Sequence, residues 1–239
     1  MIPDSSAADR VIRRGRLLTV VGLVLLAGIY LLAFQFTPAE RGQGLAFKIL
    51  YVHAPAAWAA ETAFVLVGLV GILYFWLKDE RLDVFAEASA EVGMVFATVI
   101  LTTGPIWGRT IWGHYWAWDP RLTFTLLLYV LFAGYFALRS AIRDPAERAR
   151  FAAVLGIMGM LLVPFIHLTV YLFRSQHPMP VLGRPPCPLE NPDCAPSLPW
   201  VLLRPLLASF VVFTLLYVGF VTIRYGIGLR RAAQEGSDA

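Results

Sequence analysis

Residues 107–123, WGRTIWGHYWAWDPRLT, carry the side chains best suited to binding a ligand. Four of the chain's seven tryptophans lie within the first twelve residues of this stretch: Trp107, Trp112, Trp116 and Trp118. Aromatic rings stack on flat partners at centroid distances of roughly 4.5–7 Å, so the cluster suits a planar ligand. Tryptophan and tyrosine also collect at the surface of membranes, which makes an interface belt the alternative. The two glycines and the turn sequence DPR favour a ligand platform.

Two histidines, His53 and His177, lie near the ends of apolar segments on either side of this stretch. Imidazole is a common neutral metal ligand, and two imidazoles on opposite faces of haem iron give six-coordinate ligation. His114 is a third candidate ligand, and the alternative is that all three are ordinary loop residues. Arginines nearby would pair with the haem propionates through charge-assisted hydrogen bonds. The candidates are Arg109, Arg121, Arg174 and Arg184. The sequence thus contains the parts of a haem clamp.

The composition places these residues in a membrane protein. Hydrophobic residues make up 58% of the 239 residues and charged residues only 15%, and the mean hydropathy is +0.66. A bilayer core about 30 Å thick needs roughly 20 apolar residues per helical span. Continuous runs of this kind exclude a β-barrel and predict an all-α, polytopic protein with six transmembrane helices in one domain, 1–239. The predicted spans are about 17–36, 50–77, 84–106, 122–139, 151–173 and 200–223.

The basic residues predict the orientation of these spans. Thirteen of the twenty lysines and arginines fall on one side, in the amino-terminal segment, two connecting loops and the tail. Loops rich in these residues stay in the cytoplasm, so both termini are expected there. The outward loops are then 37–49, 107–121 and 174–199. The net charge of +4 follows from this topology and does not indicate nucleic-acid binding.

Several local features lead to further expectations. Pro105 and the glycine before it should end the third span, and the charged segment 78–91 should form a helix along the membrane surface. Pro55 suits a first helical turn, so His53 should lie at or just ahead of a helix start. Glu61 is costly inside a span and should face the bundle interior. His167 is interpreted as a hydrogen-bonding residue, with a ligand role as the alternative.

Other kinds of chemistry find little support in the sequence. Cys187 and Cys194 lie in the last outward loop, on the oxidising side, where a disulfide is expected and a redox-active pair is the alternative. The covalent haem attachment motif CxxCH is absent, so any haem would be haem b held without covalent bonds. No phosphate loop is present, so the chain is not expected to hydrolyse ATP, and the energy must come from a partner.

The tryptophan-rich stretch resembles the WWD signature of haem-handling membrane proteins. With six spans, YVHAP ahead of the second, and histidines ten residues apart across the end of the fifth, the chain resembles the haem exporter protein C (CcmC) family of cytochrome c maturation over nearly its whole length. The resemblance implies that His53 and His177 are the axial ligands of haem iron. It assigns the signature to Trp107, Gly108, Trp112, Gly113, Trp116, Trp118, Asp119 and Arg121.

The resemblance also implies a function. The protein would hold haem at the periplasmic side of the bacterial inner membrane and present it to the haem chaperone CcmE. It would act in a complex with CcmD and the ABC subunits CcmA and CcmB, as a haem-transfer subunit without enzymatic activity. Asp119 is expected to organise the loop or the edge that contacts the chaperone, and capping of the fourth span is weighed against direct haem contact.

Two other functions remain as alternatives. A cytochrome c haem lyase shares the signature, but such proteins are generally larger and carry further histidines. A haem-independent scaffold would use the aromatic residues only as an anchor in the membrane interface.

Overall fold

The protein is described by a computed structural model that covers residues 5–173, 175–177 and 198–237. These residues form six long helices and one short 3₁₀ helix: α1 (Ser5–Phe36), η1 (Leu45–Ile49), α2 (Leu50–Leu77), α3 (Glu80–Trp112), α4 (Pro120–Ala141), α5 (Pro145–Leu172) and α6 (Trp200–Ser237). All six long helices are long and apolar enough to cross a membrane. The predicted all-α, six-span fold is therefore confirmed.

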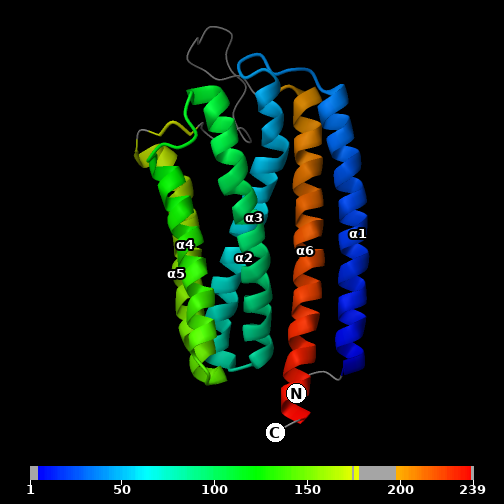
Figure 1. Ribbon diagram of the computed structural model, residues 1–239, viewed down its shortest axis with the longest axis vertical. Coiled ribbons are helices and arrows are strands. Elements are labelled where there is room, and N and C mark those ends of the chain that lie inside the picture. Colours follow the sequence, from blue (N-terminus) through cyan, green and yellow to red (C-terminus); the bar gives the residue numbers. More distant parts are fainter. Residues whose placement is uncertain (1–4, 174, 178–197, 238–239) are drawn as a thin grey trace.

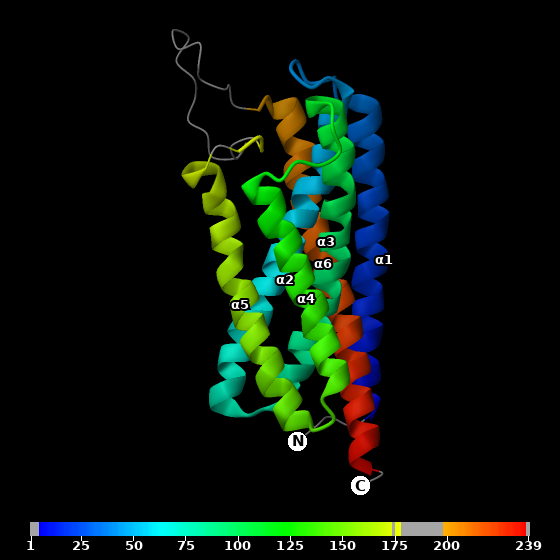
Figure 2. The ribbon, with the colours of Figure 1, turned by 60° about the vertical axis from the view of Figure 1, so that its left-hand side comes forward.

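The helices run side by side, with α2 near the centre of the bundle (Figures 1 and 2). Helix α2 packs against α3, α5 and α6, while α1 packs on α6 and α4 on α5. The contact between α3 and α4 is small. The start of α1 and the end of α6 lie at one end of the bundle, and the segments 37–44 and 113–119 lie at the other (Figure 1). The second end is called the outward end below.

Small side chains bring the central helices close together. Alanines spaced three and four residues apart give α2 one buried face of small residues, which lets neighbouring backbones approach: Ala56, Ala59, Ala60 and Ala63. Farther along α2, a Cβ atom on Gly68 would lie 2.4 Å from the Cβ of Met160 and 2.9 Å from the carbonyl oxygen of Gly156. Helix α5 therefore packs directly on the α2 backbone, and a larger residue at position 68 would force the two helices apart.

A buried ion cluster joins α3 and α4 at the end remote from the tryptophans. The Arg139 side chain is only 5% exposed and lies 2.6 Å from an Asp83 carboxylate oxygen and 2.8 Å from one of Glu87. Removing one partner of a buried ion pair leaves an uncompensated charge, which typically costs about 3–5 kcal/mol. The cluster thus fixes α4 to α3 where the two helices otherwise touch little.

The expected end of the third span at Gly104 and Pro105 is wrong, because α3 continues to Trp112. Proline removes one backbone hydrogen bond, but helices in membrane bundles tolerate this when neighbouring helices and hydroxyl side chains support the backbone. At this point α3 packs on α2, and His53 of α2 approaches Gly104. The helix ends instead at Gly113, whose φ of 83° is left-handed and suits glycine.

The segment 78–91 does not form a separate surface helix, since α3 begins at Glu80 and includes most of it. Asp79 caps this helix, and its carboxylate accepts a hydrogen bond of 2.9 Å from the backbone N–H of Arg81. Hydrogen bonding to the Arg81 side chain also lowers the pKa of Asp79 to about 2. The carboxylate therefore remains ionised and keeps its capping role over the physiological pH range.

Candidate functional site

His53 lies in the first turn of α2 and faces α3. The prediction placed His53 at or just ahead of a helix start, with Pro55 in the first turn; α2 instead begins at Leu50, directly after η1, so Pro55 lies inside the helix and not in its first turn. The His53 Nδ1 atom lies 2.9 Å from the Thr103 hydroxyl oxygen. A Cβ atom on Gly104 would lie only 3.1 Å from the His53 Cε1 atom. Glycine at position 104 therefore leaves the space in which the imidazole approaches α3.

Thr103 bonds both His53 and its own helix. Its hydroxyl lies 2.7 Å from the carbonyl oxygen of Val99, which can only accept a hydrogen bond. When the hydroxyl donates its one proton to Val99, it accepts from the Nδ1–H of His53, and the other nitrogen, Nε2, keeps its lone pair. Hydrogen bonding of this kind orients histidines that bind metals, so this tautomer leaves Nε2 available as a ligand.

Trp107 supports the same imidazole from the next turn of α3. Its ring meets the ring of His53 edge-on, with centroids 5.7 Å apart and an interplanar angle of 74°. The indole Nε1 donates a hydrogen bond of 2.9 Å to the side-chain oxygen of Gln43, in the loop between α1 and α2. Residues four apart share one face of a helix, so Thr103 and Trp107 approach His53 together.

The other three tryptophans of the signature do not share this contact. Within the described part of the chain, Trp107 is the only one whose ring packs on the His53 ring. Trp112 packs on His114 with centroids 6.4 Å apart, and Trp116 meets Trp118 edge-on at 5.8 Å. Trp118 is 76% exposed. The predicted platform therefore divides into one ring that packs on His53 and three that pack elsewhere.

Asp119 caps α4, which is one of the two roles considered for it from the sequence. It is buried and directly precedes Pro120, which occupies the first helical position. One carboxylate oxygen accepts from the backbone N–H of Arg121 at 2.9 Å. The other accepts from the backbone N–H of Gln176 at 2.7 Å, so Asp119 also holds the segment that follows α5.

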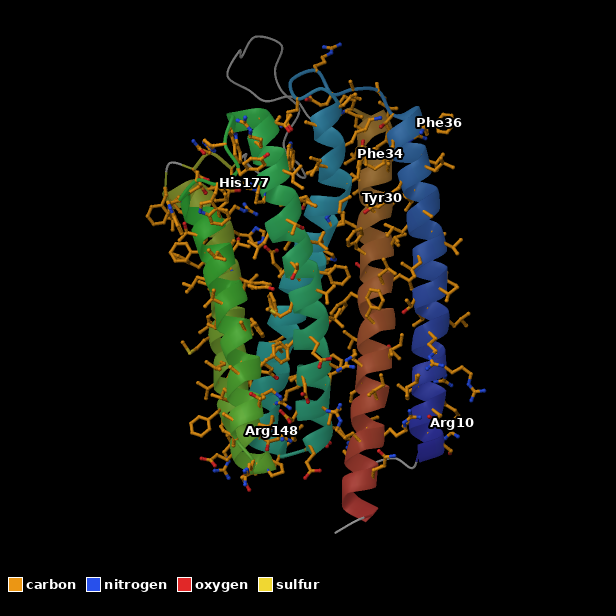
Figure 3. All side chains as sticks on the ribbon, in the orientation of Figure 1. Arg10, Tyr30, Phe34, Phe36, Arg148 and His177 are labelled. Carbon is orange, nitrogen blue, oxygen red and sulfur yellow. The ribbon has the colours of Figure 1, made fainter. Side chains whose placement is uncertain are left out.

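His177 and Arg121 are related to the rest of the site by electrostatic interactions. Electrostatic interactions link His53 to His177 and to Arg121. Figure 3 shows His177 at the outward end of the bundle, opposite Arg10 and Arg148. The acidic groups that act on Arg121 are Glu61 and Asp119. Among the residues that the structure describes, the Arg121 guanidinium makes no hydrogen bond or ion pair of its own, which leaves its donors for an anion.

The other arginines considered for an anionic group are less suited or lie elsewhere. The Arg109 side chain donates to the carbonyl oxygen of Gly113 at the end of α3, and its guanidinium lies 5.8 Å from the centroid of the Tyr115 ring. Arg174 and Arg184 lie outside the described residues, as does the cysteine pair Cys187 and Cys194. Arg121 is therefore the candidate that the described structure favours.

Glu61 and His167 form a hydrogen-bonded pair that the sequence did not reveal as a pair. The His167 Nε2 atom lies 2.8 Å from a Glu61 carboxylate oxygen, joining α5 to α2 about two turns deeper than His53. The sequence predicted an inward Glu61 and a hydrogen-bonding His167, and the structure makes each the partner of the other. Thr103 and Gln43 were missed, because their contacts with His53 and Trp107 join segments that meet only in the folded chain.

Comparison with known proteins identifies the family of this chain. Residues 6–237 match the family described as "Heme exporter protein C". The heme exporter protein C of Haemophilus influenzae is 35% identical over 209 residues, which cover 87% of this chain and 81% of the relative. That of Bradyrhizobium diazoefficiens is 34% identical over 196 residues, 82% of this chain and 71% of the relative. That of Rhodobacter capsulatus is 31% identical over 203 residues, 84% and 80% of the two chains. With its six membrane-spanning helices, the chain belongs to the heme exporter protein C family.

Proposed function

We propose that this chain binds haem b non-covalently and presents it to the haem chaperone CcmE during the maturation of c-type cytochromes. His53 and His177 are the axial ligands of the iron. The site faces the periplasm from the bacterial inner membrane, and both chain termini lie in the cytoplasm. Membership of the heme exporter protein C family supports a role in haem handling, and haem is the cargo of the protein.

The observation that carries this proposal is the arrangement around His53. Its Nε2 atom keeps a lone pair when Thr103 accepts a hydrogen bond from Nδ1–H. Electrostatic interactions link His177 and Arg121 to the same imidazole. A second imidazole, and a guanidinium with no partner among the described residues, match what a bis-histidine haem with anionic propionates requires.

The surrounding residues then have separate roles. Trp107 covers the porphyrin beside His53, and Arg121 pairs with a propionate. Trp112, Trp116 and Trp118 form the aromatic surface nearer the outward end, where the chaperone would receive haem. Because the chain has no phosphate loop, ATP hydrolysis belongs to CcmA, which acts with CcmB and CcmD in the same complex. The chain itself is a binding and transfer subunit.

The visible spectrum of the purified protein, co-expressed with its chaperone, tests this assignment. We expect a low-spin, bis-imidazole spectrum in the parent and its loss or conversion to high spin in His53→Ala and in His177→Ala. His114→Ala is the matched control, since this histidine packs on Trp112 and should leave the spectrum unchanged. A parent without haem, or a spectrum unaltered in both ligand variants, would refute the assignment.

A further inference from the structure

Asp119 differs from the other aspartates that cap helices in this protein. Asp79 and Asp144 accept backbone hydrogen bonds from the first turn of their own helices. Asp119 accepts one such bond from Arg121 but gives its second oxygen to the backbone N–H of Gln176, 57 residues away in sequence. Its side chain is buried, so both bonds lie in surroundings where a lost partner is costly. One carboxylate thus joins the start of α4 to the segment after α5.

The backbone held by Asp119 is the backbone that carries His177. Gln176 directly precedes this histidine, and its N–H lies 2.7 Å from the Asp119 carboxylate. The next N–H, that of His177 itself, donates to the Ser175 hydroxyl at 3.1 Å. Two successive backbone groups are therefore fixed, which limits where the imidazole of His177 can lie. The placement of His177 relative to the rest of the site therefore depends on these two hydrogen bonds.

We propose that Asp119 is the positioning residue for His177: its carboxylate fixes the peptide of Gln176 and thereby places the second imidazole opposite His53. The inference rests on the proposed function, in which His177 is an axial ligand. Asp119 then acts through the backbone and does not touch the haem. The aspartate of the tryptophan signature and the histidine after α5 form one structural unit.

Asparagine at this position separates the new role from helix capping. Asp119→Asn retains an oxygen for one N–H, and asparagine caps helices about as well as aspartate. Its amide nitrogen is a donor, however, so one oxygen is left for the two N–H groups of Arg121 and Gln176. Asp144→Asn is the matched control, because Asp144 caps α5 without a distant partner among the described residues. Gln176→Ala is the second control, since only the backbone of that residue is bound.

Two measurements on the full-length protein in detergent test the proposal. Hydrogen–deuterium exchange of the haem-free protein should show the Gln176 amide exchanging about tenfold faster or more in Asp119→Asn, as expected when a hydrogen bond to a charged acceptor is lost. Haem added to the same variant should give the high-spin spectrum of His177→Ala, and added imidazole should restore low spin in both. Both control variants should behave as the parent.

The outcomes separate this inference from the proposed function. If His177→Ala leaves the parent spectrum unaltered, His177 is not a ligand and the proposed function itself fails. If His177→Ala changes the spectrum while Asp119→Asn changes neither the spectrum nor the exchange at Gln176, Asp119 does not position the histidine. A changed spectrum with unchanged exchange at Gln176 would also overturn the inference, because it would indicate direct contact between Asp119 and haem.

Discussion

Replacing Thr103 with valine should weaken haem binding without disturbing the fold. The substitution keeps the shape of the side chain but removes the acceptor that lies 2.9 Å from the His53 Nδ1 atom. A buried N–H left without an acceptor costs about 1–3 kcal/mol. Loss of the hydrogen-bond partner of a metal-binding histidine typically lowers metal affinity by about 10–100-fold. The two estimates agree, because about 1.4 kcal/mol corresponds to a tenfold change.

The assay is a titration of the detergent-purified, haem-free protein with ferric haem, followed by absorbance. We expect the dissociation constant of Thr103→Val to rise by about 10–100-fold and that of Thr103→Ser, which keeps the hydroxyl, to stay near the parent value. Thr102→Val is the matched control. Among the residues that the structure describes, its hydroxyl bonds only carbonyl oxygens of its own helix, so its loss should leave the affinity unchanged.

Two results would refute this reasoning. An unchanged affinity in Thr103→Val would mean that the hydroxyl does not set the tautomer of His53. An equal loss of affinity in Thr102→Val would mean that the effect arises from α3 in general. Thermal unfolding of all three variants, measured in parallel, separates a local effect at the imidazole from loss of the folded protein.

Three further predictions concern other parts of the molecule. Gly104→Ala places a Cβ atom 3.1 Å from the His53 Cε1 atom, so haem affinity should fall at least several-fold in the same titration while the helical circular dichroism is retained. Trp118→Ala removes a ring that is 76% exposed, so the dissociation constant for haem should stay within about twofold of the parent value. Transfer of haem to CcmE should slow in this variant, as measured by haem stain of the chaperone. Asp83→Ala leaves the buried Arg139 with fewer partners, and stability should drop by about 3 kcal/mol, seen as a lower thermal midpoint, whereas Asp83→Glu should recover part of it.

Length and hydropathy were sufficient to predict the six helices, because a span must satisfy its own backbone over the thickness of the bilayer. The ends of the helices were less predictable. The interruption expected at Pro105 does not occur, because α3 packs on α2 and continues to Trp112. Whether proline ends a helix depends on its neighbours in space, and these do not appear in a local pattern.

In the candidate site, too, some residues could be predicted from the sequence, while others depend on contacts that form only in the folded chain. His53 and Trp107 stood out by residue type, and the structure brings their rings together. Thr103 did not stand out, because threonines in spans usually bond carbonyl groups of their own helix, as Thr98 and Thr102 do. Only the packing of α2 on α3 distinguishes Thr103 from these neighbours. The second bond of Asp119 was equally hidden, since it joins segments that meet only in the folded chain.

The hydrogen bond between Trp107 and Gln43 couples binding at the candidate site to binding at the loop between α1 and α2. Gln43 lies in the loop between α1 and α2, and its backbone N–H is held by Glu40 at 2.7 Å. A molecule that binds this loop and breaks the bond to Trp107 forfeits about 1 kcal/mol, roughly a fivefold change in affinity. Coupling free energies are reciprocal, so cargo that displaces Trp107 changes the affinity for that molecule by the same factor. Under the proposed function, a partner bound to this loop can therefore distinguish the haem-bound protein from the haem-free protein without contacting the haem.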